Sequence, residues 1–102
     1  MASRLKLHEE LCVILESRRV YFQPPESVKM AYPCIRYSKP GITSAHANNK
    51  IYRNTDRYEV IVIDQDPDSV IPEKILSHFS MCSFDRGYTA DNLNHFVFTI
   101  YY

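Results

Sequence analysis

Three carboxylates alternate at Asp64, Asp66 and Asp68, as they do at the start of a calcium-binding loop, and hard cations favour clustered carboxylate oxygens. The rest of such a loop is missing, because Ser69 stands where the sharp turn needs glycine and no glutamate closes the site. Acidic residues ahead of an apolar run also suit the start of a helix, where they accept hydrogen bonds from free amides. The sequence therefore favours an N-cap within 66–69 over a metal site, and no cofactor is predicted.

A histidine and a cysteine, His8 and Cys12, stand one helical turn apart and could present two metal ligands or an activated thiol. A structural zinc site usually needs four ligands in closely spaced pairs, and the other cysteines and histidines show no such pairing. Cys12 is therefore interpreted as a small core residue. No phosphate loop, serine-nucleophile motif or HExxH is present, so we predict that the protein is not an enzyme. A small enzyme using Cys12 or Cys82 stays open as a rival.

Aromatic and basic residues alternate at Phe84, Arg86 and Tyr88, which would share one face of a strand and place a guanidinium between two rings. Such a group could be a stacking platform for single-stranded nucleic acid or a cation–π pair that covers a sheet edge. Twelve basic and twelve acidic residues cancel, which favours the second interpretation. The alternative, a nucleic-acid-binding module, would use Tyr52, Arg53, Arg57, Phe84, Arg86 and Tyr88.

These side chains have to be positioned by helices and strands, whose order follows from periodicity. Apolar residues recur at helical spacing over about 4–17, with His8 on the polar side, and again from Ser69 to about His78. Four consecutive β-branched residues, Val60 to Ile63, predict a central strand that is apolar on both faces. Further extended segments are predicted at 20–22, 32–37, 82–88 and 95–102, the last two forming a hairpin with a turn around 91–94.

The predicted fold is α+β in a single domain over 1–102, with an antiparallel or mixed sheet of about four strands and two helices packed on it. A polar stretch from Ser38 to about Asn54 predicts a long loop between the first two main strands, and such loops often carry function. The residues expected to contact a partner are Lys39, His46, Asn49, Lys50, Arg53 and Asn54. Arg57, Asp85 and Arg86 are expected at contacts between subunits.

Composition restricts the environment of the chain. Three widely spaced cysteines favour reduced thiols in a cytosol, and no apolar stretch reaches the roughly 18 residues of a membrane-spanning helix. Eight tyrosines and no tryptophan give aromatic surface that is common at protein interfaces. These features predict a compact domain with aromatic surfaces that is made and kept in a cytosol.

Several short blocks, in order, resemble the tail terminator and tail completion proteins of long-tailed bacteriophages, a family often labelled minor capsid or head–tail joining proteins. The blocks are YPCIRY at 32–37, NKIYRNTDRYEV at 49–60, IDQDPDS at 63–69 and CSFDRGYTADNLNHFVF at 82–98. Together they span most of the chain, and their order carries more information than any one block.

The resemblance implies a structural virion protein of the head–tail interface, assembled in the bacterial cytoplasm. Its copies would form a homo-oligomeric ring, commonly a hexamer, that caps the tail tube protein and meets the head-tail connector or stopper protein. DNA would only pass through the lumen, and neither a membrane nor a cofactor is implied. Sister proteins of similar size form head completion or stopper rings, which is the alternative role in the same neck.

Overall fold

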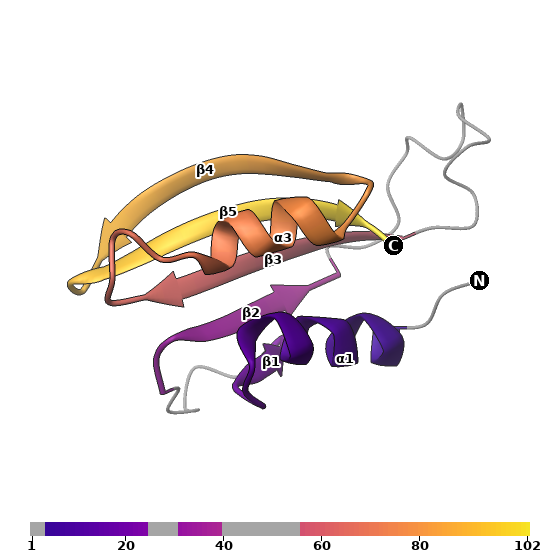
Figure 1. The fold of residues 1–102 in the computed structure, drawn as a ribbon, viewed down its shortest axis with the longest axis horizontal. Helices are drawn as coiled ribbons and strands as arrows, with labels where there is room; N and C mark the ends of the chain where they lie inside the picture. Colours follow the sequence, from indigo (N-terminus) through magenta and orange to yellow (C-terminus); the bar gives the residue numbers. More distant parts are fainter. Residues whose placement is uncertain (1–3, 25–30, 40–55) are drawn as a thin grey trace.

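The computed structural model describes residues 4–24, 31–39 and 56–102 and shows two helices and five strands (Figure 1). In chain order the elements are α1 (Arg4–Leu15), β1 (Val20–Phe22), β2 (Cys34–Ser38), β3 (Arg57–Asp64), α3 (Ile71–His78), β4 (Cys82–Ala90) and β5 (Leu93–Tyr101). The predicted α+β class and the order of the elements are confirmed. None of the helices in these ranges is long and apolar enough to cross a membrane.

The strands form one mixed sheet in the order β1-β2-β3-β5-β4, which corrects the expected number of about four strands. The additional strand is β1, which pairs in parallel with β2, whereas the other neighbours are antiparallel. A three-residue extended piece becomes a strand only through its partner, so local sequence does not reveal it. The β-branched run lies in β3, at the middle of the sheet, as predicted. This strand has a neighbour along each of its two edges, β2 and β5, and apolar side chains suit such a central position.

Both helices lie on the same side of the sheet and enclose the core (Figure 1). Leu7 and Leu11 of α1 and Ile75 of α3 are fully buried there. The sheet contributes alternate residues, because side chains of a strand point to opposite faces in turn. Those alternate residues are Ile35, Tyr37, Tyr58, Val60, Val62, Phe98 and Ile100. The one-sided helix layer leaves the opposite face of the sheet free of any described helix.

The acidic turn before α3 differs from the prediction. The N-cap is Val70 and makes no side-chain capping bond, so the expected cap within 66–69 is wrong. The Asp64 carboxylate accepts a hydrogen bond from the Asp66 amide at 3.0 Å, and the Asp66 carboxylate accepts one from the Asp68 amide at 2.9 Å. Ser69 Oγ accepts a bond from the Ile71 amide at 3.3 Å. The carboxylates therefore shape the turn itself, because short polar side chains readily bond the backbone two residues on.

The predicted hairpin is confirmed, and its turn is shorter than expected. Asp91 and Asn92 connect β4 to β5 with φ values of 53° and 62°. A two-residue connection with both φ values positive matches the right-handed twist of the strands, and Asp and Asn tolerate this conformation better than most residues. The turn fixes the register of β4 against β5.

Candidate interaction surface

The side of the sheet that no described helix covers is called the open face below. Its members come from alternate positions of β2, β3, β5 and β4, opposite in direction to the core residues. Its exposed or partly exposed residues include Arg36, Arg57, Glu59, Ile61, Asp85, Arg86, Tyr88, His95, Thr99 and Tyr101. Three further apolar residues of this face, Cys34, Ile63 and Val97, are buried. All three residues predicted for subunit contact thus fall on one surface.

Arg57 and Asp85 come together at a hollow of about 90 Å³ on the open face, which Glu59 and Thr99 also line. Asp85 Oδ2 accepts a hydrogen bond from Thr99 Oγ1 at 2.6 Å. The Nε of Arg57 is buried and has no hydrogen-bond partner among the described residues. Because a buried donor without a partner costs free energy, the hollow suits a polar group that accepts from Arg57 and donates to a carboxylate.

Arg86 lies beside this hollow, but not in the arrangement that the sequence predicted. Phe84 pairs with Phe98 and Arg86 with Val97, so Asp85 is an extra residue in a β-bulge. The bulge puts Asp85 and Arg86 on the open face and leaves Phe84 on the helix side. There its ring packs against that of Phe98, with centroids 5.3 Å apart.

The prediction that Phe84, Arg86 and Tyr88 share one face of a strand is therefore wrong, since alternation holds only in a strand without a bulge. The Arg86 guanidinium lies 5.9 Å from the centroid of the Tyr88 ring, and that ring stacks on His95 at 4.6 Å. Sequence reasoning missed His95. The signal was available in the hairpin, where a two-residue turn places residue 95 opposite residue 88.

The residues predicted to contact a partner fall mostly outside the described part of the chain. Of the six, only Lys39 is described, and its Nζ lies 3.0 Å from the Asp56 carboxylate. The other five, His46, Asn49, Lys50, Arg53 and Asn54, lie outside the described residues. Asp56 also exchanges two backbone hydrogen bonds with Tyr102, each of 3.0 Å. The two ends of the β2–β3 connection are thus held beside the end of β5.

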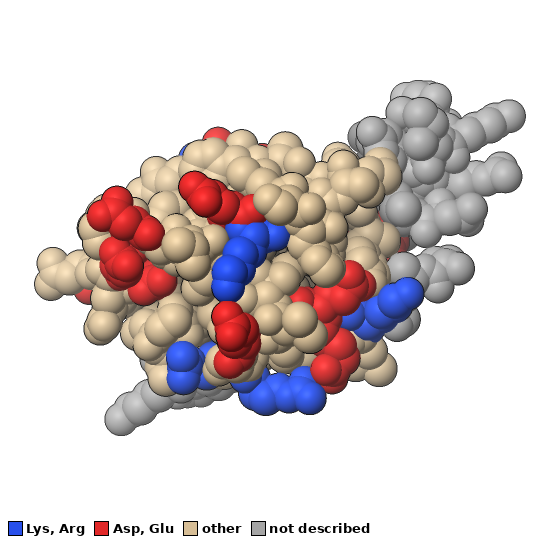
Figure 2. Space-filling view, in the orientation of Figure 1, with Lys and Arg blue, Asp and Glu red and all other residues tan. Residues whose placement is uncertain are grey.

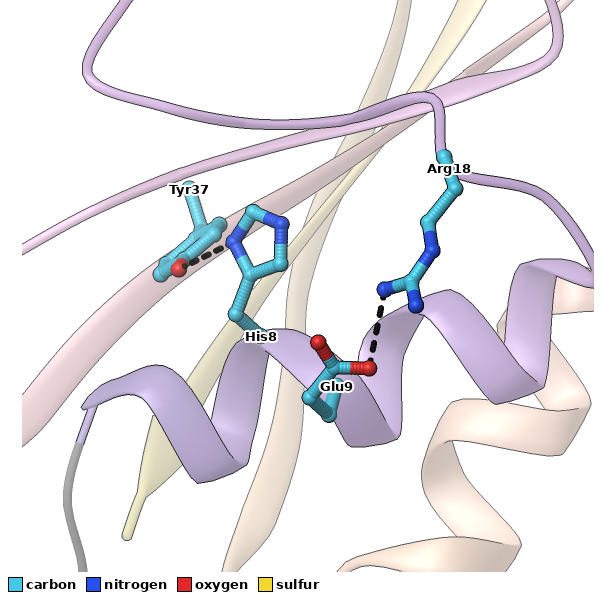
Figure 3. A network of polar contacts seen from close by, with 4 residues as sticks. All are labelled: His8, Glu9, Arg18 and Tyr37. Atoms are coloured by element: carbon cyan, nitrogen blue, oxygen red, sulfur yellow. Dashed lines mark hydrogen bonds and ion pairs between the residues drawn. The ribbon is translucent and has the colours of Figure 1, made fainter.

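A polar network under α1 was not foreseen, because His8 was placed on the polar side of the helix. Its ring points at Tyr37, with 2.8 Å between Nδ1 and the hydroxyl, whereas the neighbouring Glu9 pairs with Arg18 (Figure 3). Arg4 donates to the same hydroxyl at 3.2 Å. The Tyr37 hydroxyl thus has Arg4 and His8 as partners, and burial lowers the pKa of that histidine from its ordinary value. This network joins α1 to β2.

A second unforeseen contact joins α1 to α3 and β5. One oxygen of the Glu10 carboxylate lies 2.7 Å from His78 Nε2, and the other accepts a hydrogen bond from the Tyr102 hydroxyl. The Tyr102 ring also packs edge-on against Phe79. Glu10 therefore ties the helix layer together at its junction with the sheet.

The cysteine thiols differ in their surroundings from activated nucleophiles. Burial raises the pKa of Cys34 to about 11 and that of Cys82 to about 11. Both thiols are therefore protonated near neutral pH, and the thiol is a much weaker nucleophile than the thiolate. Cys12 is buried in the core, as its interpretation as a core residue predicted.

Comparison of the chain with protein-family models, curated proteins and solved structures found no significant match. The resemblance to phage tail terminator and tail completion proteins that the ordered sequence blocks predict therefore stays a prediction.

Proposed function

We propose that the protein is a structural subunit of the neck of a tailed bacteriophage, where a ring of copies ends the tail tube and joins it to the head. The sequence blocks at 32–37, 49–60, 63–69 and 82–98 suggest the family. The observation that carries the proposal is that the subunit has two unlike sides, a helix side and the open face. A ring built head to tail needs two such different surfaces.

The helix side presents apolar side chains to solvent. Leu5 and Val13 lie on the outer side of α1, and their exposed fractions are 64% and 71%. Val70 and Leu76, at and within α3, are exposed by 59% and 45%. Exposed apolar groups gathered on one side are typical of protein contacts. Figure 2 shows positive and negative side chains mixed on this side. This side therefore lacks the continuous positive charge that attracts nucleic acid.

The open face complements that side chemically. Ile61 is partly exposed near its middle, between Arg36 of β2 and Val97 of β5, and charged residues surround it, which is the usual anatomy of an interface with an apolar centre and a polar rim. Tyr101 adds partly exposed aromatic surface at the end of β5. The unpartnered Nε of Arg57 and its hollow add a place for a polar group of the neighbour. Packing the helix side of one copy on the open face of the next gives a heterologous contact, which closes into a ring at the right rotation.

The ring contact can be tested with the purified protein. We expect sedimentation equilibrium to show a mass that is a multiple of 12.0 kDa, and negative-stain images to show rings at high concentration. Val13→Glu places a charge on the helix side and should weaken association at least about tenfold, as an uncompensated charge at an interface does. Gln65→Glu, in the exposed turn after β3, is the matched control and should leave association unchanged. Association that Val13→Glu does not alter would contradict this contact.

The role in the neck can be tested in the phage. A stop codon in the gene should give tails of uncontrolled length that do not attach to heads, because nothing ends the tube. A head completion or stopper role would instead give tails of normal length and heads that lose their DNA. Normal, infectious particles would exclude both roles. Lys50→Ala combined with Arg53→Ala addresses the predicted loop contact, and normal yields and tail lengths would remove that loop from the mechanism.

A further inference from the structure

The strand β4 is an unusually open edge of the sheet. It runs over the nine residues Cys82–Ala90, of which 83–89 are all exposed. The opposite edge strand, β1, has only three residues. An exposed edge is a template for pairing with another strand, and natural proteins usually shorten or cover it. Since β1 is too short to match β4, a continuous sheet from β4 of one copy to β1 of the next would leave most of β4 unpaired.

The backbone groups that β4 turns outward can be derived from its pairing with β5. Tyr101 donates to the Met81 carbonyl at 2.9 Å, so Met81 faces β5 and alternation turns Cys82 and Phe84 outward. At the other end the two-residue turn pairs Ala90 with Leu93, which turns Thr89 and Gly87 outward. Even-numbered residues therefore turn outward before the bulge and odd-numbered residues after it. The bulge makes this shift possible, because Asp85 and Arg86 both lie opposite the single residue Val97 of β5.

The outward groups are consequently symmetric about the bulge. Phe84 and Gly87 flank it, and Cys82 and Thr89 follow at equal distance on either side. We propose that β4 pairs in antiparallel fashion with β4 of a second copy, about a two-fold axis that passes between Asp85 and Arg86. Phe84 then faces Gly87 of the second copy, and Cys82 faces Thr89. The other antiparallel registers of β4 on itself either set an outward group against one that already bonds β5 or, as with Cys82 opposite Phe84 or Gly87 opposite Thr89, pair only the half of the strand on one side of the bulge.

The side chains fit the same register. On the open face Asp85 comes opposite Arg86 of the second copy, and the symmetry makes this ion pair twice. Asp85 uses one oxygen for Thr99, which leaves the other free for Arg86. On the helix side the Phe84 ring, 48% exposed, comes opposite a glycine without a side chain. An aromatic ring that covers a glycine on the neighbouring strand is a favourable cross-strand pair.

The two-fold contact is centred on the edge at β4 and stands without the proposed ring. The ring would use the broad faces of the subunit, and the two contacts share only the charged residues Asp85 and Arg86 at the rim of the open face. The occupant of that edge is a second copy of this chain, because the order of outward groups and the charges on β4 complement themselves. A strand of another protein would have no need to match this symmetry.

A charge exchange tests the register. Asp85→Arg and Arg86→Asp each set like charges opposite one another across the axis, so each should weaken dimerisation at least about tenfold. The double variant Asp85→Arg/Arg86→Asp recreates opposite charges and should restore the dimer, although both Asp85→Arg variants lose the bond to Thr99. Every chain in this comparison also carries Val13→Glu, so that no ring forms. Sedimentation equilibrium at about 100 µM, where weak contacts are populated, should give twice the subunit mass of 12.0 kDa for the chain with unchanged β4 and for the double variant. A monomer for the chain with unchanged β4, or single variants that match it, overturns the proposal, as does a double variant without recovery.

Thr89→Pro tests the hydrogen bonds. It removes an outward N–H, a change that an edge strand tolerates, and should abolish the dimer while the circular dichroism stays unchanged. In hydrogen exchange, the Phe84, Gly87 and Thr89 amides of wild type should become slower as concentration rises, whereas the Arg86 and Tyr88 amides should not change. Exchange independent of concentration at the first three amides refutes the pairing. A ring would keep its mass in Thr89→Pro and lose it in Val13→Glu, so failure of one proposal is distinguishable from failure of the other.

Discussion

His8 shows how one residue can acquire a role that its place in the sequence does not reveal. It lies between α1 and β2, with its Nδ1 2.8 Å from the Tyr37 hydroxyl. Burial has the largest effect in lowering its pKa, and Arg4 and Arg18 act in the same direction, whereas Glu9 opposes them. Both burial and the two arginines disfavour the charged imidazolium.

Stability should therefore depend on pH through His8. Because the pKa of His8 in the folded state lies below its ordinary value of 6.5, the unfolded state binds more protons as the pH falls through this range. The free energy of unfolding should decrease between about pH 6.5 and the lowered folded pKa, and the loss is complete below the latter. Urea unfolding at pH 8 and pH 5 should show a smaller decrease for His8→Gln than for wild type. Equal decreases would contradict the assignment.

At the scale of elements, Glu10 fixes the packing of α1 against α3 and the end of β5. Its neighbour Glu9 also has an ion pair, with Arg18, but both side chains are mostly exposed, by 62% and 75%. Solvent and side-chain entropy reduce the value of such a pair. The two adjacent glutamates thus offer a matched comparison on one helix.

Glu10→Gln should destabilise the fold more than Glu9→Gln. The first change weakens bonds to His78 and Tyr102 in a partly buried place and should cost about 1–2 kcal/mol. The second should cost less than about 0.5 kcal/mol. Urea denaturation at pH 7, with the slope of the transition checked for constancy, measures both. Equal losses would show that Glu10 does not hold the helix layer together.

The strands illustrate which parts of an element local sequence can predict. Alternation in β5 is unbroken, and Phe98 and Ile100 share its core face, as the alternation of an extended strand requires. Alternation in β4 is broken by the bulge at Asp85, so the predicted aromatic platform does not exist. The isolated glycine Gly87 inside β4 is a local sign of an irregularity, since such a glycine often marks a bulge. It does not say which residue is the extra one, because that depends on the fit of β4 to the register that the turn and Met81 impose from either end.

At the scale of the whole molecule, α1, α3 and the sheet share one core among the described residues. We therefore expect one cooperative unfolding transition. Tyrosine fluorescence and far-ultraviolet circular dichroism should give the same midpoint in urea. Each helix and the sheet bury their apolar side chains against one another, so the unfolding of one exposes those of the others. Two separated midpoints would indicate units that fold independently.

The sequence by itself determined the elements of this protein. The β-branched run gave the central strand, helical periodicity gave α1 and α3, and Asp91 with Asn92 closed the hairpin, since each depends on neighbours in the chain. The residues expected at subunit contacts lie on one surface only because the bulge turns both Asp85 and Arg86 to the open face. Tertiary structure alone decided the pairing of β1, the bulge in β4, the Glu10 contacts and the hollow beside Arg57. Their partners are distant in sequence and meet only when the sheet and the helices pack, so no local pattern encodes them.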